Sequence, residues 1–532
     1  MKIEGIIIGI IIALSFNMIP AKNGQEVKMQ NENISKIRKI TGETISTTKI
    51  DEIVNFYMRE ASVTGLSLSI LNDNKISYVK SYGFRDKDNN KFLNEYSVMC
   101  GASFSKFLFS YIVMQLVEEN IIDLDKPLYQ YLEKPIPEYE IYSDLKGNKY
   151  WEKLTARICL NHTTGFPNSR IFNTNQKLEF FFEPGSKFAY SGEGIYLLQF
   201  VIEKITGKGL EEIAVEKVFA PLKMSNSSYL WQDKYEDNYA VGHNILEENI
   251  DYQRRDQASA GGSLNTTAED YSKFIEAILH KKGLSNASFD EMLSPSIRIK
   301  SMHQFPSISY ETTDENDDIN LSYGLGCVVI DTDYGKAFFK EGHGLGFQNY
   351  TITFIEQGTS IVIMTNSDNG EMIFKDLLEK LIGDTFTPCK WERYIPYHEI
   401  TEQSIGVYLY DIILMDSIEN AIGTYKKIKG SSIKGRYLFN EAELNNLGYQ
   451  MLKEGRIGNA IKLFELNMEE YPNSANVYDS LAEAYQTNNQ IDLAIEYYEK
   501  SIELNPESKA RRVLEKLKNI QKSKNIRGDS NE

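Results

Sequence analysis

Alternating and helical patterns of apolar residues predict a mixed fold for the first two thirds of the chain. Residues 65–71 (GLSLSIL) alternate as a strand, 72–75 (NDNK) have turn chemistry, and 76–82 return as a second strand. Apolar residues recur at helical spacing over 104–119, and a shorter helix is expected near 51–60. A short helix is thus expected before the hairpin and a longer one after it.

Two more strands are predicted much later in the chain. Residues 349–354 and 360–366 are strand-like and are separated by Glu356-Gln-Gly, while the segment between 120 and 340 mixes loops and helices. Strands at both ends of a long helical middle indicate one sheet that is closed by distant parts of the chain. We therefore expect an α+β domain over 51–385, with polar 314–318 as a surface loop.

The C-terminal part repeats itself. Residues 442–475 and 476–509 align at a constant offset of 34, which pairs small or apolar residues of one segment with those of the other. The pattern resembles two tetratricopeptide repeats within 436–515, although an unrelated pair of helical hairpins would share part of it. About three repeats are usually needed for stability, so these two should lean on a neighbour. A helical connector over 386–435 could supply a degenerate earlier repeat, and 516–532 is a polar tail.

The N-terminus has the pattern of a secretory signal. Lys2 precedes an apolar run over 5–16, and Ala21 lies where a small residue is expected at a cleavage site. The run is shorter than the roughly 20 residues that span a bilayer, but an uncleaved anchor is the alternative. We expect a signal peptide over 1–21, a polar leader over 22–50 and a periplasmic or extracellular protein.

Composition and charge narrow the classes of function. The 532 residues are 42% hydrophobic and 25% charged, which is typical of globular proteins, and the net charge is −17. No basic face stands out in the sequence, so a nucleic-acid partner is not indicated. The four cysteines form no CxxC pair and the six histidines form no HExxH, so zinc sites and disulfide scaffolds are not indicated. No metal or organic cofactor is implied.

One serine lies where nucleophilic chemistry is easily built. An S-x-x-K pair at a helix start brings a lysine amine to a serine hydroxyl, beside the free N–H groups of the helix N-terminus. The pattern is weak evidence by itself because it recurs along the chain, where it begins at Ser46, Ser77, Ser103, Ser143 and Ser431. Only Ser103-Phe-Ser-Lys106 directly precedes a long apolar helix. The alternative for Ser103 is an N-cap serine.

Two later segments carry further candidates. Tyr190-Ser-Gly192 precedes an apolar helix and offers a phenol that could carry a proton, although a packing tyrosine is the ordinary explanation. Gly342-His-Gly-Leu-Gly346 precedes a predicted strand and could equally be a glycine-rich turn with a surface histidine.

In this order, the segments resemble the serine hydrolase family of class C β-lactamases, penicillin-binding carboxypeptidases and related esterases. The family's S-x-x-K and K-T-G motifs identify its site. The resemblance covers roughly 50–385 and implies that Ser103 is acylated, that Lys106 relays its proton, and that Tyr190 acts as general base and acid. It places His343 where many members have the lysine of K-T-G. It implies oxyanion or substrate contacts from the Ser103 N–H, Gly192, Gly344 and Gly346.

Two departures from the family pattern leave the substrate open. Gly192 replaces the asparagine of Y-x-N, which would hold a substrate amide, and Leu345 shifts the spacing around the second oxyanion donor. We expect an exported serine hydrolase acting on an ester, a D-amino-acid peptide or a β-lactam, with a protein partner for the repeats. The alternative is a weakly catalytic or non-catalytic binding or sensor protein on the same fold.

Overall fold

A single large antiparallel sheet organises the domain that contains the predicted site. The computed structural model describes residues 36–173, 175–250, 254–400, 402–507 and 510–528. Within these residues the sheet has nine strands in the order β10-β11-β12-β13-β14-β15-β3-β4-β5. The strands are β3 (Gly65–Asn72), β4 (Lys75–Asp86), β5 (Lys91–Phe92), β10 (Ile297–Arg298), β11 (Ser322–Tyr323), β12 (Val328–Thr332), β13 (Gly335–Gly344), β14 (Phe347–Phe354) and β15 (Thr359–Thr365).

The sheet is closed between its first and last long strands, as the sequence predicted. β15 pairs with β3 in an antiparallel register that places Ile363 opposite Leu68. The β3–β4 hairpin turns at Asp73 and Asn74, which both have positive φ and are residue types that tolerate this conformation. The predicted hairpin and the α+β class are confirmed.

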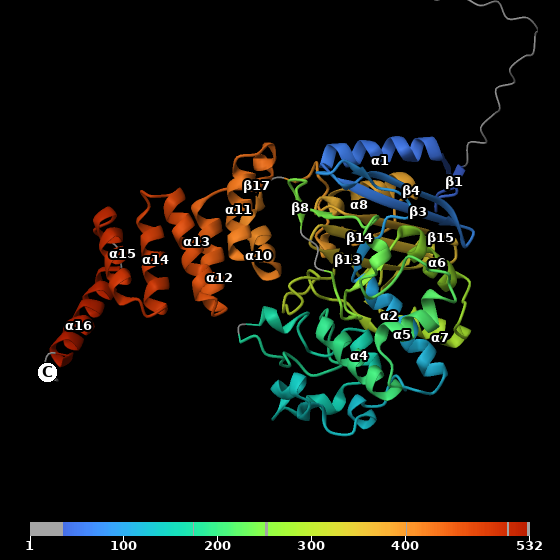
Figure 1. Ribbon diagram of the computed structural model, residues 1–532, viewed down its shortest axis with the longest axis horizontal. Coiled ribbons are helices and arrows are strands. Elements are labelled where there is room, and N and C mark those ends of the chain that lie inside the picture. The colour runs from blue at the N-terminus through green and yellow to red at the C-terminus, as the bar shows by residue number, and fades with distance from the viewer. Residues whose placement is uncertain (1–35, 174, 251–253, 401, 508–509, 529–532) are drawn as a thin grey trace, which may run out of the picture. The chain divides into compact units, whose positions relative to one another are not determined.

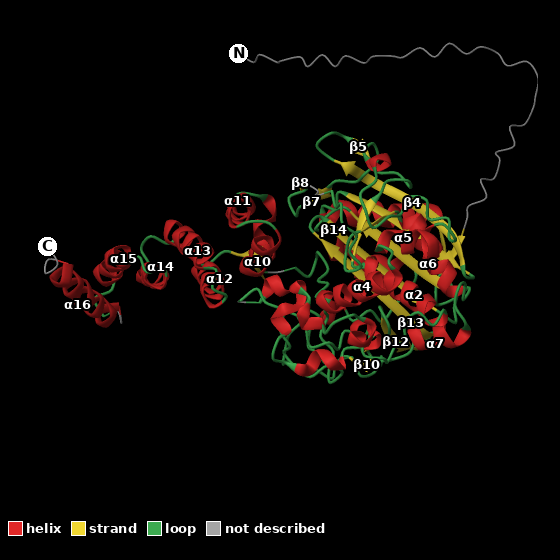
Figure 2. Ribbon diagram, turned by 60° about the horizontal axis from the view of Figure 1, so that its bottom comes forward, coloured by secondary structure: helices red, strands yellow, loops and turns green. Residues whose placement is uncertain are grey.

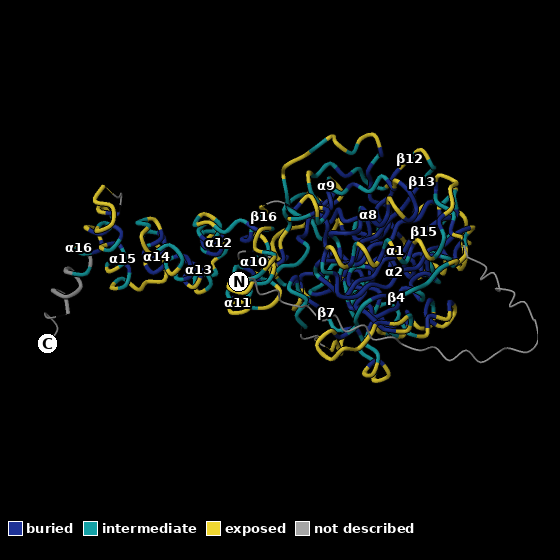
Figure 3. The backbone as a smooth tube through the Cα atoms, turned by 90° about the horizontal axis from the view of Figure 1, so that it is seen from above, coloured by how far each residue is buried: buried dark blue, intermediate teal, exposed yellow. Residues whose placement is uncertain are grey.

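Helices cover both faces of the sheet (Figures 1 and 2). α1 (Thr47–Ala61) and α8 (Phe374–Leu381) pack with one face in a core that includes Phe339 of β13. α2 (Phe104–Glu118) and α6 (Ala268–Leu279) share the core on the opposite face, which includes Phe338. α2 is buried on nearly all sides, and Figure 3 shows it within the buried interior.

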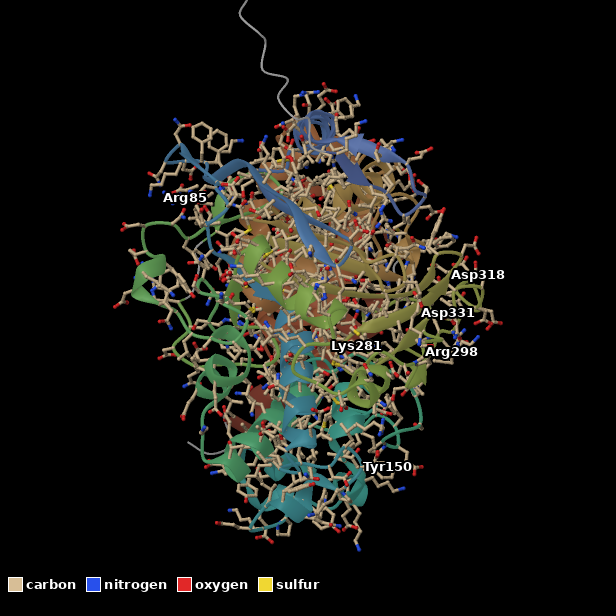
Figure 4. All side chains as sticks on the ribbon, turned by 90° about the vertical axis from the view of Figure 1, so that its right-hand side faces the viewer. Arg85, Tyr150, Lys281, Arg298, Asp318 and Asp331 are labelled. Carbon is tan, nitrogen blue, oxygen red and sulfur yellow. The ribbon has the colours of Figure 1, made fainter. Side chains whose placement is uncertain are left out.

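Short helices and loops build the region beside α2. They include α3 (Ala156–Leu160), α4 (Gly192–Thr206), α5 (Leu210–Ala214) and α7 (Asn286–Met292). Two short pairs flank the site: β6 (Met99–Ala102) with β9 (Leu264–Thr266), and β7 (Gly242–His243) with β8 (Asn249–Ile250). Figure 4 shows Asp318 of the predicted surface loop at the periphery.

The C-terminal region is helical, as predicted. Its helices are α10 (Ile405–Met415), α11 (Ile418–Lys429), α12 (Glu441–Lys453), α13 (Ile457–Glu470), α14 (Ala475–Thr487), α15 (Ile491–Leu504) and α16 (Ala510–Gly528). A short parallel pair, β16 (Gln403–Ser404) with β17 (Tyr437–Leu438), precedes the repeats. Leu409 and Tyr425 of the connector share one buried core with Leu444 and Leu481 of the repeats. The two repeats therefore lean on the helical pair before them.

The structure shifts two of the predicted segment boundaries. Residues 36–50 were expected to be a polar leader, but they form β1 (Lys36–Arg38), β2 (Thr44–Ser46) and the start of α1, because Ile37 and Ile45 are buried. α9 (Cys389–Glu392) was expected within the connector, but its Trp391 packs in the core beside α1 and α8. The predicted signal peptide lies outside the described residues. Among the described helices, none is both long and apolar enough to cross a bilayer.

Candidate active site

Ser103 lies in a turn between a strand and a buried helix. β6 ends at Ala102, which has a φ of 45°, a strained value for a residue with a Cβ, and Ser103 is then the N-cap position of α2. The Ser103 side chain makes no capping hydrogen bond. Ser103 therefore occupies the N-cap position without its side chain acting as a cap, and its hydroxyl is left for other contacts.

Lys106 lies one helical turn further on, with its amine directed at Ser103. Its Nζ donates to Ser103 Oγ at 3.0 Å and to the carbonyl oxygen of Gly261 at 2.6 Å. The residue is 3% exposed. Burial, and then the charge of Lys340, lower the pKa of Lys106 to about 7. An amine with this pKa is partly unprotonated at neutral pH and can accept a proton from Ser103.

Tyr190 lies against both lysines and is also buried. The ammonium nitrogens of Lys106 and Lys340 each lie 5.0 Å from the centroid of its ring, and Lys340 Nζ donates to its hydroxyl at 3.2 Å. Burial raises the pKa of Tyr190 to about 12, although Lys340 and a hydrogen bond with Ser103 oppose the rise. Tyr190 is therefore a phenol at neutral pH, which can pass a proton on but is less suited than Lys106 to accept one.

Lys340 is the residue that sequence reasoning missed. Alternate residues of β13 face opposite sides of the sheet, and Phe338 packs with α2. Lys340 is two residues further on and faces the same side. Its amine contacts Tyr190 and forms a buried ion pair with Glu341 at 2.6 Å. Lys340-Glu341-Gly342 matches the K-x-G part of the family motif without a gap before Phe347. This spacing is the feature of the sequence that could have identified Lys340.

His343 does not bring its side chain to Ser103. The ring faces the side of α1 and α8, where its Nε2 lies 3.1 Å from the hydroxyl of Tyr394. Burial lowers the pKa of His343 to about 4, so the ring is neutral at pH 7. The prediction that His343 occupies the place of the K-T-G lysine does not match this geometry, because the strand register gives that place to Lys340.

The main-chain N–H of His343 is better placed than its ring to serve as a donor at the site. β12 pairs with β13 only over Gly335–Phe339, so the edge beyond Phe339 has no strand neighbour on that side. Gly344 and Phe347 close the two-residue turn as a hydrogen-bonded pair, and along an antiparallel ladder such pairs alternate with pairs that are not hydrogen-bonded. The next pair, His343 with Gln348, is therefore not hydrogen-bonded, and the His343 N–H points to the open edge of β13. A Cβ on neighbouring Gly342 would lie 2.5 Å from the Gly101 oxygen. β13 thus lies against the start of α2.

The other predicted backbone donors are occupied. The N–H of Gly346 donates to Asp368 Oδ1 at 2.7 Å, and the N–H of Gly344 points to β14 by the same alternation. Gly192 begins α4 next to Tyr190, and its N–H donates to the carbonyl oxygen of Asn168 at 3.0 Å. None of these three N–H groups is directed at Ser103.

A loop residue fills the space beside Gly192. A Cβ on Gly192 would lie 2.6 Å from the Asn168 carbonyl oxygen, so a larger residue could not be accommodated without movement of this loop. The absence of the family asparagine is therefore part of the local packing. His162, expected to be structural, is fully buried, and its Nδ1 accepts the Ser191 N–H at 3.1 Å. The ring supports the Tyr190 segment from behind.

Comparisons with known proteins identify the family and the repeat. The family model for β-lactamase matches residues 50–383, and the chain belongs to this family. The model for the tetratricopeptide repeat matches residues 475–508. The resemblance and the fold predicted from the sequence are confirmed, and membership supports a serine hydrolase.

Named relatives are distant. Penicillin-binding protein 4* of Bacillus subtilis (strain 168) is 22% identical over 55% of this chain and 66% of its own length, just under two thirds. Teichoic acid D-alanine hydrolase of Staphylococcus aureus is 22% identical over 69% of this chain and 92% of its own. The octameric penicillin-binding protein homologue of Pyrococcus abyssi has a TM-score of 0.51 at 20% identity, covering 69% and 81% of the two chains, which shows the fold alone.

Proposed function

We propose that this member of the β-lactamase family hydrolyses an acyl substrate through an acyl-enzyme on Ser103. The contact that carries the proposal is the 3.0 Å hydrogen bond from a buried lysine to a serine hydroxyl that caps nothing. A structural serine at this position would bond to the helix, and a structural lysine would keep its charge in solvent. The arrangement favours a nucleophile and its base.

Acylation follows from the positions of the groups. Neutral Lys106 takes the proton from Ser103 Oγ while the oxygen attacks the substrate carbonyl carbon. The N–H groups of Ser103 and His343 stabilise the oxyanion, and one such donor is typically worth ~10²–10³ in rate. Tyr190 donates its proton to the leaving oxygen or nitrogen, and Lys106 returns a proton to the Tyr190 oxygen. The products are the Ser103 ester and the protonated leaving group.

Deacylation uses the same groups with water as the nucleophile. Water loses a proton to the Lys106–Tyr190 pair and attacks the ester carbon, and the same two N–H groups hold the second oxyanion. The bond to Ser103 Oγ then breaks, and the oxygen regains its proton. Lys340 keeps its charge throughout, because Glu341 neutralises it locally and Tyr190 accepts its hydrogen bond.

The substrate we favour is an ester. With Gly192 packed against Asn168, the site lacks the asparagine that would hold a substrate amide, and losing a polar partner costs ~1–3 kcal/mol. An ester depends less on that contact, because its leaving group needs less help from a proton. The teichoic acid relative, named as a D-alanine hydrolase, is consistent with a D-alanyl ester.

Two covalent probes test the nucleophile. The intact protein, and its Ser103→Ala variant, are exposed to a fluorophosphonate and to a labelled penicillin, and adducts are located by mass spectrometry. We expect one adduct on Ser103 with the fluorophosphonate and none in the variant. Loss of the hydroxyl should leave the melting temperature nearly unchanged, because it makes no cap bond. No adduct with either probe on folded protein would favour a binding or sensor protein.

The preference for esters is tested by turnover. Short-chain nitrophenyl esters are expected to be hydrolysed with a higher kcat/KM than nitrocefin, which should be turned over slowly or only acylate the enzyme. A kcat/KM for nitrocefin above that for every ester tried would make the protein a β-lactamase.

Export and a protein partner belong to the same proposal. The apolar run over 5–16 supports secretion across the cytoplasmic membrane, with a mature chain that starts near residue 22. N-terminal sequencing of protein from fractionated native cells tests this, and a full-length cytosolic protein would contradict it. The repeats offer a helical surface for a protein or peptide, which would bring the hydrolase to its substrate.

A further inference from the structure

An exposed tyrosine packs against two glycines that adjoin the proposed catalytic groups. Tyr196 follows Gly192 by one turn of α4, and 40% of it is exposed. A Cβ added to Gly192 would lie 3.6 Å from Tyr196 Cε2, and a Cβ added to Gly261 would lie 2.4 Å from Tyr196 Cε1. The ring therefore bridges the two glycines, and only a glycine at 261 leaves room for it in this position.

Both glycines lie next to groups that act on the substrate in the proposed mechanism. The carbonyl oxygen of Gly261 accepts from Lys106 Nζ at 2.6 Å, and the same amine donates to Ser103 Oγ at 3.0 Å. Standard covalent dimensions then place the Tyr196 ring at most about 12 Å from Ser103 Oγ. On the other side, Gly192 follows Tyr190 by two residues. A substrate whose carbonyl is held at Ser103 therefore has the Tyr196 ring within reach of its side groups.

The spacing between the ring and the Gly261 segment is fixed by a second residue of α4. Gln199 Oε1 accepts the Ala260 N–H at 2.8 Å, and Gln199 Nε2 donates to the carbonyl oxygen of Ala258 at 2.9 Å. One helix thus carries both the ring and the clamp on the loop against which the ring packs. A wall of fixed position discriminates by size, because a group that does not fit has to displace it.

The substituents of the scissile carbonyl carbon point in three directions. Its oxygen lies at the N–H groups of Ser103 and His343 in the proposed mechanism, and its leaving group meets the Tyr190 hydroxyl, which accepts from Lys340 of β13. The Tyr196 ring packs instead on the loop that holds Lys106. The substituent that remains for this side is the acyl chain.

We propose that Tyr196 is a specificity residue whose ring closes the acyl side of the site and restricts the substrate to short acyl groups. This inference rests on the hydrolase proposed above and adds the size of acyl group that it accepts. It also connects Tyr196 with the departure at Gly192, because the ring and Asn168 together take up the room that a side chain at 192 would need.

A series of nitrophenyl esters from acetate to octanoate tests the restriction in the full chain. For the wild type, we expect kcat/KM to fall at least ~10-fold between the shortest and the longest chains. Tyr196→Ala opens the wall and should remove most of this difference by raising the value for octanoate, while the value for acetate stays within about threefold. Tyr196→Phe keeps the ring and should keep the wild-type preference, which separates the size of the ring from its hydroxyl.

Tyr96→Ala is the matched control, since it removes a tyrosine that is 66% exposed in the segment between β5 and β6. It should leave the chain-length preference unchanged. A wild type that hydrolyses octanoate as well as acetate would overturn the proposal. So would a preference that is unchanged in Tyr196→Ala, or one that changes equally in Tyr196→Ala and Tyr196→Phe.

Labelling with fluorophosphonates separates this inference from the proposed function. Two probes are compared by mass spectrometry, one with a methyl and one with an octyl substituent on phosphorus. The methyl probe should label Ser103 at similar rates in the wild type and Tyr196→Ala, whereas the octyl probe should label Tyr196→Ala at least ~10-fold faster. Equal relative rates in the two proteins would refute the role of Tyr196 and leave the nucleophile established. No adduct with either probe would refute the hydrolase, and this inference with it.

Discussion

Removing the charge of Lys340 should move the pH dependence of the reaction in a direction that can be calculated. The low pKa of Lys106 has two causes, burial and the nearby positive charge of Lys340, and Glu341 opposes them. Lys340→Met keeps the length and apolar stem of the side chain but removes its charge. The pKa of Lys106 should therefore rise, and the reaction should need a higher pH.

The distance between the two lysines sets the magnitude. Both ammonium nitrogens lie 5.0 Å from the centroid of the Tyr190 ring, so their separation is at most twice that value. Two unit charges about 10 Å apart repel by ~1.7 kcal/mol at an effective dielectric constant of 20. This energy corresponds to ~1.2 pH units, and a shorter separation increases it. In Lys340→Met the acidic limb of kcat/KM should move upward by about one unit or more.

The assay is the pH profile of kcat/KM for a nitrophenyl ester, with the rate of fluorophosphonate inactivation as a second measure. The limb position is independent of any general loss of rate that follows from the missing contact with Tyr190. The double variant Lys340→Met/Glu341→Gln is the control, because it removes both charges of the pair. It should shift the limb upward by less than the single variant. A limb that stays in place or moves to lower pH in Lys340→Met would refute the electrostatic argument.

Three further predictions concern stability and position. Lys106→Met should stabilise the fold by ~1–3 kcal/mol at pH 6, because the native state disfavours the charged amine. The gain in stability should shrink as pH rises toward the pKa of an unfolded lysine near 10.4, since the amine of the unfolded wild type then loses its charge as well. Urea midpoints that differ equally from the wild type at pH 6 and at pH 9.5 would contradict this. His343→Ala should keep most of the esterase kcat, whereas Lys340→Ala should lose ~10²-fold, and the reverse order would restore the histidine to the site. A fragment of 436–515 should melt at least ~10 °C below one of 403–528, which includes the helical pair that shares its core; equal melting temperatures in circular dichroism would show that the repeats are autonomous.

Local patterns made much of the fold predictable. The β3–β4 hairpin and α2 have clear alternation, helical spacing and turn residues, so neighbouring residues carry the whole signal. The Ser103–Lys106 pair is predictable for the same reason, since both residues lie on one helical turn. The short strands from β10 to β12 were not predicted, because strands of two to five residues contain too few alternations to stand out.

The error at His343 had a different origin. The predicted strand began after the glycine-rich segment, but β13 starts at Gly335 and runs through it, so His343 belongs to a strand and its side chain has a definite face. One face of β13 carries Phe338, Lys340 and Gly342, and the other carries Glu341 and His343. A shift of three residues reverses the face. The K-x-G spacing was in the sequence, but only the strand register distinguishes it from the histidine motif.

The charge balance of the site depends on residues that no local pattern connects. In the proposed mechanism Lys106 acts as the base, because burial and a neighbouring cation lower its pKa. That cation, Lys340, is tolerated in the interior because Glu341 accompanies it. Glu341 in turn stays ionised in the interior because the Lys340 amine lies 2.6 Å from it and holds its pKa below the ordinary value. Each of these charges affects the next one outward from Ser103, so substitution of Glu341 is expected to change the pKa of Lys106 although Glu341 makes no contact with Ser103.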